Sequence, residues 1–179
     1  GEQSAGKTGL CLNIIKDNMN KWNTTYFNSE MGSFELKKRL QMFDDLAISD
    51  WNFKAYERSD EFEYVVIPGE GNFNIIDFLE IHEDFYKVGG MINKIFRKLN
   101  GAICIICIQK NPGSDQGLGG FRTLEKPRLA LAMKPGAIKI VKAKNFKNND
   151  NPNGKVIRFT LAAGCWLHAT TDWHHEAKR

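Results

Sequence analysis

The first eight residues constrain the fold of this chain more than any other segment. They match the pattern G-x-x-x-x-G-K-[ST] at every fixed position, as Gly1-Glu2-Gln3-Ser4-Ala5-Gly6-Lys7-Thr8. The glycines let the backbone turn sharply and point successive N–H groups at phosphate oxygens. Lys7 can reach the outer phosphates of a nucleotide, and the Thr8 hydroxyl can ligate Mg²⁺. The octapeptide therefore predicts a phosphate-binding turn that leads into a helix.

Size and composition fit one globular domain. The chain has 179 residues, of which 42% are hydrophobic and 26% are charged, and these values exclude bulk disorder and a coiled coil. The longest apolar run, Ala102 to Ile108, has the length of a strand, whereas a membrane span needs ~18 residues. The net charge of +4 permits nucleic-acid binding but is weak support for it. Four cysteines and the lack of an apolar leader predict a protein of the reducing cytoplasm, without a membrane partner.

Strands and helices are expected to alternate after the octapeptide. Helices are predicted over residues 7–20, 33–48, 59–66 and 83–99, with Leu10, Ile14 and Ile15 on the buried side of the first and Ser33 as the N-cap of the second. Strands are predicted over 24–28, 51–56, 73–77 and 102–109, with antiparallel strands at 129–133, 138–143 and 155–161. This pattern predicts an α/β fold with a mainly parallel sheet flanked by helices. We expect one domain over residues 1–170 and a flexible tail over 171–179.

Two carboxylates are candidates for the chemistry of phosphoryl transfer. Asp77 ends the apolar run 73–77, so a buried strand would deliver its charge to the sheet edge near Mg²⁺. Glu30 follows the strand predicted at 24–28 and can orient an attacking water. The simpler alternatives are a strand-end aspartate and an exposed turn glutamate. The octapeptide upstream favours the catalytic interpretation of both.

The strand predicted at 102–109 carries three further residues of interest. Cys104 and Cys107 are three positions apart, which places them on opposite faces of a strand, so we expect core residues and not a metal or redox pair. Gln109 ends the strand, at the edge where open α/β sheets bind ligands.

The glycine-rich segment 111–120 that follows is either an ordinary surface loop or a loop that contacts DNA. The basic stretch 139–147 is either a functional basic surface or an ordinary solvated face, and the sequence supports the two interpretations equally.

Together these motifs resemble the ATPase core of the RecA/DnaB superfamily, especially the domain of DnaB-type replicative helicases and their phage and plasmid relatives. The similarity covers residues 1–161. Besides the octapeptide, it rests on four segments. Tyr26 to Met31 is similar to the family's strand ending in Glu-Met, and Ile75 to Glu80 is similar to its Asp-Tyr-Leu-Gln segment. Gln109 corresponds to its phosphate-sensing glutamine, and Lys142 to Asn145 resembles its Lys-x-Arg-Asn motif.

The resemblance implies a RecA-like P-loop fold, ATP and Mg²⁺ as cofactors, and single-stranded DNA as the partner of a homo-oligomeric ring, expected to be a hexamer. It implies nucleotide binding by Gly1, Ser4, Ala5, Gly6, Lys7, Thr8 and Gly9, and Mg²⁺ binding by Thr8 and Asp77. Glu30 would activate water with the help of Lys7, and Gln109 would sense the γ-phosphate and couple it to the glycine-rich loop.

The same resemblance implies that Lys142 and Lys144 act in the site of a neighbouring subunit. Lys144 stands where the family usually has Arg, and Glu80 replaces a Gln. Lysine is a point charge without the bidentate fork of arginine, so this departure weakens the expected action in trans.

Other functions remain open at this stage. A recombinase would assemble into filaments and not rings, and a regulatory ATPase would bind a protein partner and show no stimulation by DNA. A small kinase is a further P-loop class, but the sequence shows no arginine-rich lid and places Glu30 where a kinase does not need it.

A phosphate-binding loop normally follows a buried strand. The octapeptide starts at Gly1, so we expect a chain truncated at its N-terminus, with an empty place beside the strand that ends in Asp77. The alternatives are that another segment, such as the C-terminal tail, fills this place or that the sheet closes without it. With the place empty, the start of the loop would lack an anchor, and weak nucleotide binding is expected for that reason.

Overall fold

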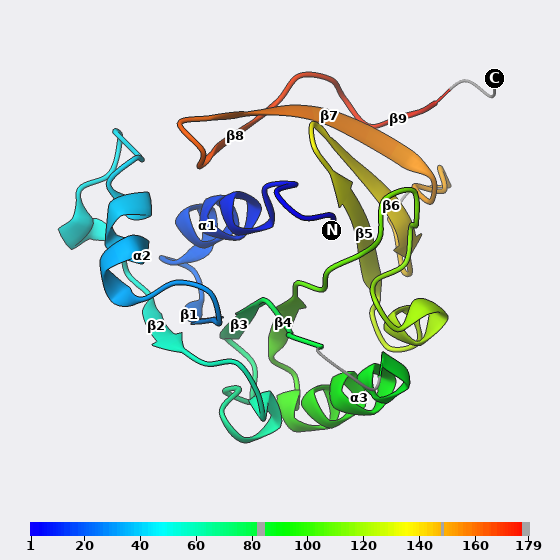
Figure 1. Cartoon of the computed structure of the whole chain (residues 1–179), viewed down its shortest axis with the longest axis horizontal. Coiled ribbons are helices and arrows are strands. Elements are labelled where there is room, and N and C mark those ends of the chain that lie inside the picture. Colours follow the sequence, from blue (N-terminus) through cyan, green and yellow to red (C-terminus); the bar gives the residue numbers. More distant parts are fainter. Residues whose placement is uncertain (82–84, 148, 177–179) are drawn as a thin grey trace.

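The computed structural model describes residues 1–81, 85–147 and 149–176 and contains two sheets (Figure 1). The first is parallel, in the order β2-β1-β3-β4, with the bounds β1 Asn23–Asn28, β2 Lys54–Glu57, β3 Asn72–Asp77 and β4 Ile103–Ile106. The second is antiparallel, in the order β5-β6-β7-β8 with β9 beside β7. Its bounds are β5 Leu129–Lys134, β6 Ala137–Ala143, β7 Lys155–Ala162, β8 Trp166–Ala169 and β9 His174–His175. The predicted α/β class is confirmed.

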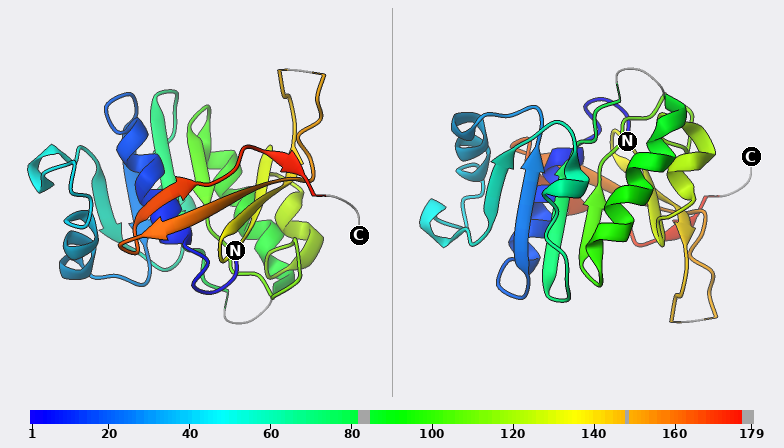
Figure 2. Two further views of the ribbon diagram at one scale, coloured as in Figure 1. Left: turned by 90° about the horizontal axis from the view of Figure 1, so that it is seen from above. Right: turned by 90° about the horizontal axis from the view of Figure 1, so that it is seen from below.

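Helices cover both faces of the parallel sheet (Figure 2). On one face lie α1 (Lys7–Asn18) and α2 (Ser33–Leu40), and on the other lies α3 (Val88–Leu99). Short 3₁₀ turns join these elements: Ile48–Asp50, Phe62–Tyr64, Phe85–Lys87 and Gly120–Leu124. Among the described residues, every helix is too short or too polar to cross a bilayer.

The central strands β1 and β3 are buried on both sides, as parallel strands between helices must be. Tyr26 and Ile75 point into the core beneath α1 and α2. Phe27 and Ile76, the next residue of each strand, point into the core beneath α3. This alternation aims the residues at the strand ends in a defined direction and so fixes the geometry of the candidate site.

The helix α1 lies between the two sheets (Figure 1). Cys11, Leu12 and Ile15 pack against the parallel sheet, whereas a Cβ atom at Gly9 would stand only 2.9 Å from Leu161 Cδ1 of β7. Of the residues predicted to form the buried side, Ile15 is fully buried, but Leu10 and Ile14 are only partly so. The prediction assumed one apolar stripe, and the second sheet covers the other side of the helix as well.

Several predicted boundaries were wrong. Helix α2 ends at Leu40 and not near residue 48, because the chain turns there and places Phe43 in the core. Its N-cap is Gly32 and not Ser33. The stretch 59–66 forms a single 3₁₀ turn, and the helix predicted over 83–99 begins at Val88, with residues 83–84 outside the described residues. Asn100, at φ 42°, ends α3 as expected.

The place expected to be empty beside β3 does not exist. Strand β3 pairs with β1 on one side and with β4 on the other, so that prediction was wrong about the strand order. The octapeptide itself bridges the two sheets. The amino group of Gly1 donates to the Ile108 carbonyl at 2.6 Å, and the Gly1 carbonyl accepts from the Lys110 N–H at 2.9 Å.

The second sheet holds the next residue of the octapeptide. The Glu2 N–H donates to the Met133 carbonyl of β5 at 2.9 Å. The start of the phosphate-binding turn is thus anchored on both sides, contrary to the reason given for weak nucleotide binding. Within the segment predicted to be a flexible tail, His174 and His175 pair with β7, and residues 177–179 lie outside the described residues.

Candidate functional site

The octapeptide forms a tight turn at the N-terminus of α1. Gly6 is the N-cap, at φ 87°, a left-handed conformation that glycine adopts without strain. The Lys7 ammonium folds back over the turn and donates to the Glu2 carbonyl at 2.8 Å. The first N–H groups of any helix lack partners within it and attract anions. The turn, the ammonium and the helix end therefore provide donors for a phosphate group, with Thr8 in the first helical turn.

An ion pair between the buried Lys110 and the partly buried Glu2 stabilises this turn. Lys110 is only 6% exposed, and its Nζ lies 2.7 Å from Glu2 Oε1. The hydrogen bond from Lys110 lowers the pKa of the Glu2 carboxyl. Sequence reasoning missed this pair because Glu2 occupies a variable position of the motif and its partner is 108 residues away.

The ends of the parallel strands bring three predicted residues to the same edge of the sheet. Asn28 pairs in register with Asp77, and the Ser29 N–H donates to the Asp77 carbonyl at 3.2 Å, so Glu30 follows immediately beyond. Asp77 is buried, with 4% exposure, whereas Glu30 is exposed. Gln109 follows β4, three residues past its end and beside the backbone bonds that hold Gly1.

Tyr26 orients the Asp77 carboxylate. The Tyr26 hydroxyl donates to Asp77 Oδ2 at 2.8 Å within the core. Burial raises the pKa of Tyr26 far above its ordinary value, and the negative charge of Asp77 raises it further. The phenol therefore stays protonated and acts as a fixed donor. Its position in the middle of a β-strand made it look like an ordinary core residue in the sequence.

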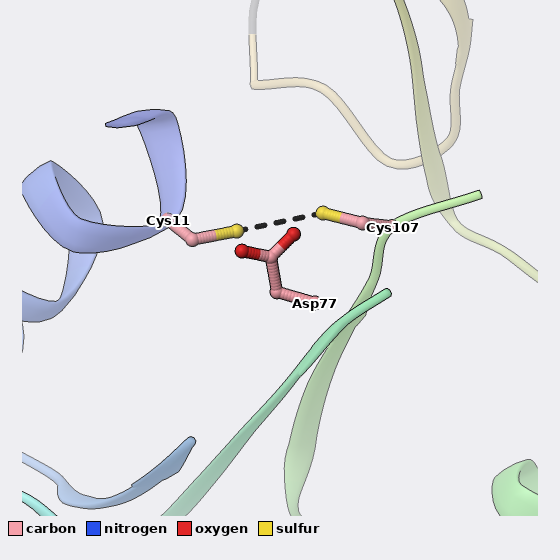
Figure 3. Close-up of side chains that lie close together, drawn as sticks. All are labelled: Cys11, Asp77 and Cys107. Carbon is pink, nitrogen blue, oxygen red and sulfur yellow. Dashed lines mark hydrogen bonds between the residues drawn. The ribbon is translucent and has the colours of Figure 1, made fainter. Parts of the chain in front are cut away.

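Two thiols meet beside the same carboxylate (Figure 3). Cys11 Sγ and Cys107 Sγ are 3.4 Å apart, and each lies within 4.8 Å of a carboxylate oxygen of Asp77. The hydrogen bond with Cys107 raises the pKa of the Cys11 thiol, burial and the charge of Asp77 raise it further, and Lys7 opposes these effects. Lys7 and Asp77 thus have opposite effects on the pKa of the Cys11 thiol.

The prediction that Cys104 and Cys107 lie on opposite faces of their strand is confirmed. Cys107 packs in the core beneath α1, and Cys104 packs in the core beneath α3. Burial raises the pKa of Cys104 to about 12. Sequence reasoning correctly separated these two residues but missed Cys11 as the partner of Cys107, because only the fold brings them together.

The glycine-rich loop returns to Gln109. The Leu118 N–H donates to the Gln109 carbonyl at 2.8 Å, and Asp115 forms an ion pair with Lys139 of β6 at 2.5 Å. A small cavity of about 90 Å³ lies where this loop meets the segment after β3, and it is lined by Phe78, Leu79, Glu80, Ile81, Gln109 and Leu118. The loop is therefore connected both to the sheet edge and to the basic stretch of β6.

The two lysines expected to act in trans differ in their surroundings. The Lys142 ammonium donates to the backbone carbonyls of Leu124 and Glu125. Burial lowers the pKa of Lys142, and the nearby charge of Lys144 lowers it further. Lys144 follows β6 and is exposed. Of the two, Lys144 presents its charge to the outside of the chain.

Neither a scan against protein families nor a search of curated proteins found a match for this chain.

Proposed function

We propose that this chain is a RecA-like P-loop ATPase core that hydrolyses ATP as part of a motor on single-stranded DNA, of the replicative helicase type. One observation carries the proposal. The turn capped by Gly6 presents Lys7 and the N-terminus of α1 at the sheet edge where β1, β3 and β4 end. These strands deliver Glu30, Asp77 and Gln109 to that edge.

The residues of this edge suit phosphoryl transfer to water, which needs positioning and charge neutralisation and no covalent intermediate. Lys7 and the N–H groups at the start of α1 would bind the terminal phosphates of ATP. Thr8 and Asp77 would hold Mg²⁺, with Asp77 oriented by Tyr26. Glu30, exposed at the end of β1, would orient the attacking water.

The motor function is proposed from the connection between Gln109 and the glycine-rich loop. Leu118 bonds to the backbone of Gln109, and Asp115 pairs with Lys139, so a shift at the sheet edge would move the loop. We propose that this loop and the lysines beside it contact single-stranded DNA, and that Lys144 reaches the neighbouring subunit of a ring.

The test is ATP hydrolysis by the protein, measured with and without single-stranded DNA. Glu30→Gln is compared with Glu57→Gln, which changes an exposed glutamate at the end of the neighbouring strand β2. We expect Glu30→Gln to lower the rate about 10²-fold or more, the typical contribution of a positioned base, and Glu57→Gln to leave it unchanged.

Each other outcome has a definite meaning. Equal rates in the two variants would overturn the catalytic role of Glu30. Hydrolysis that DNA does not stimulate would overturn the DNA motor in favour of a regulatory ATPase. Filaments in place of rings, seen by electron microscopy, would favour a recombinase.

A further inference from the structure

The cluster of Cys11, Asp77 and Cys107 is a second arrangement of ligating atoms that the ATPase chemistry does not use in full. The three residues come from α1, from the last position of β3 and from the residue after β4. Figure 3 shows the two thiols directed toward each other beside the carboxylate. One ligating atom from each residue lies within 4.8 Å of the other two.

The distance between the two sulfurs distinguishes two chemistries. A disulfide requires about 2.05 Å between the sulfurs. A tetrahedral Zn²⁺ ion with Zn–S bonds of about 2.3 Å sets its two sulfurs about 3.8 Å apart. Cys11 Sγ and Cys107 Sγ are 3.4 Å apart, so a small outward movement of the side chains accommodates an ion, whereas a disulfide requires a much larger approach.

The backbones that carry these ligands are fixed. The Cys107 N–H donates to the Ile76 carbonyl, and the Cys107 carbonyl accepts from Leu79, each at 2.9 Å. Asp77 is paired on β3, and its Oδ2 accepts from Tyr26. Carboxylates that bind metals are usually hydrogen-bonded in this way, so Tyr26 would be the outer support of Asp77, whose second oxygen is left to bind an ion.

We propose that Cys11, Asp77 and Cys107 form a binding site for a thiophilic divalent metal ion, of which Zn²⁺ is the best fit. The two sulfurs and one Asp77 oxygen supply three ligands, and the fourth position is open to water. Each thiol releases its proton to solvent as its sulfur binds the ion. The ion keeps its oxidation state, so no oxidant or reductant is needed. Cys107 is only partly buried, which gives the ion access from outside.

One consequence rests on the proposed function. An ion at this site occupies the carboxylate that would otherwise hold Mg²⁺, so Zn²⁺ is expected to inhibit ATP hydrolysis. Metal binding is measured without ATP, so the two proposals fail separately. Metal binding without ATP hydrolysis would refute only the proposed ATPase function. ATP hydrolysis without metal binding would refute only the proposed metal site.

The experiment uses Co²⁺ as an optical probe for the reduced chain. Thiolate ligation gives a charge-transfer band in the near ultraviolet, and tetrahedral geometry gives intense visible bands. We expect both at one Co²⁺ per chain, with displacement by Zn²⁺. Cys107→Ser and Asp77→Asn should weaken binding more than tenfold, as loss of a ligand exceeds loss of its outer support.

Cys104→Ser is the matched control, because Cys104 lies on β4, three residues before Cys107, but in the opposite core. It should leave the Co²⁺ spectrum and affinity unchanged. If Cys11→Ser fails to fold, Cys107→Ser decides the matter, since Cys107 is the less buried of the two. A wild-type chain without a thiolate band, or a Cys107→Ser chain that keeps it, would overturn the proposal.

Discussion

Replacing Tyr26 by Phe removes one oxygen atom from the centre of the candidate site. The Tyr26 side chain is fully buried, and its hydroxyl donates to Asp77 Oδ2 at 2.8 Å. Hydrogen bonds to charged groups contribute about 1.5–3 kcal/mol, and the carboxylate oxygen left without its donor stays buried. We expect Tyr26→Phe to lower the free energy of unfolding by that amount. For a chain of this size, a loss of ~2 kcal/mol lowers the melting temperature by roughly 4–8 °C.

The assay is urea unfolding followed by circular dichroism, with Tyr56→Phe as the control. Tyr56 is 52% exposed, and its ring stacks on Phe27 at 5.9 Å. Phenylalanine keeps that stacking, so its unfolding free energy should change by less than ~0.5 kcal/mol. The double variant Tyr26→Phe/Asp77→Asn should show a coupling energy of about 0.5–3 kcal/mol between the two residues. If Tyr26→Phe were no more destabilising than Tyr56→Phe, the hydrogen bond would not be what holds Asp77.

Three further predictions concern stability. Gly119→Ala should destabilise the fold by at least ~2 kcal/mol in thermal melts, because φ is 103° there and the new Cβ would stand 2.2 Å from Val88 Cγ1. Gly90→Ala, in open space on α3, should instead stabilise the fold by about 0.5–1 kcal/mol in the same melts. A Gly119→Ala variant more stable than the Gly90→Ala variant would contradict both predictions. The pKa of Glu2 is lowered below its usual 4.5, so its ionised form stabilises the fold above that pH, and the contribution is lost as the pH falls through the lowered pKa. The melting temperature of the wild type should therefore exceed that of Glu2→Gln near neutrality, and the difference should disappear in acid; a difference that persists in acid would refute the charge-based explanation.

The parallel half of the fold was predictable from local sequence. The strands 24–28 and 73–77 were placed to within a residue because the first is β-branched and aromatic, the second is apolar, and polar or glycine-rich turns bound both. The Pro135-Gly136 turn between β5 and β6 was equally visible, with Gly136 at φ 73°. These strands and this turn are determined by residues close together in the sequence, so local sequence patterns are enough to predict them.

What the sequence did not reveal depends on contacts between distant segments. The pairing of β3 with β4 is one such contact, and the hydrogen bond between Gly1 and Ile108, which are 107 positions apart, is another. The same holds for the meeting of Cys11 with Cys107, 96 positions apart. The buried side of α1 was predicted only in part, because its second covering, β7 and β8, comes from the other end of the chain.

The octapeptide is proposed to bind the phosphates of a nucleotide through Lys7, with Mg²⁺ held at Asp77. Calorimetric titration with Mg-ATP tests this claim most directly, because the start of the turn is anchored to both sheets. We expect saturable binding at one site per chain that Lys7→Ala abolishes and that Lys21→Ala, which changes an exposed lysine beyond the end of α1, leaves intact. Equal binding of Mg-ATP by the wild type and Lys7→Ala would contradict the claim.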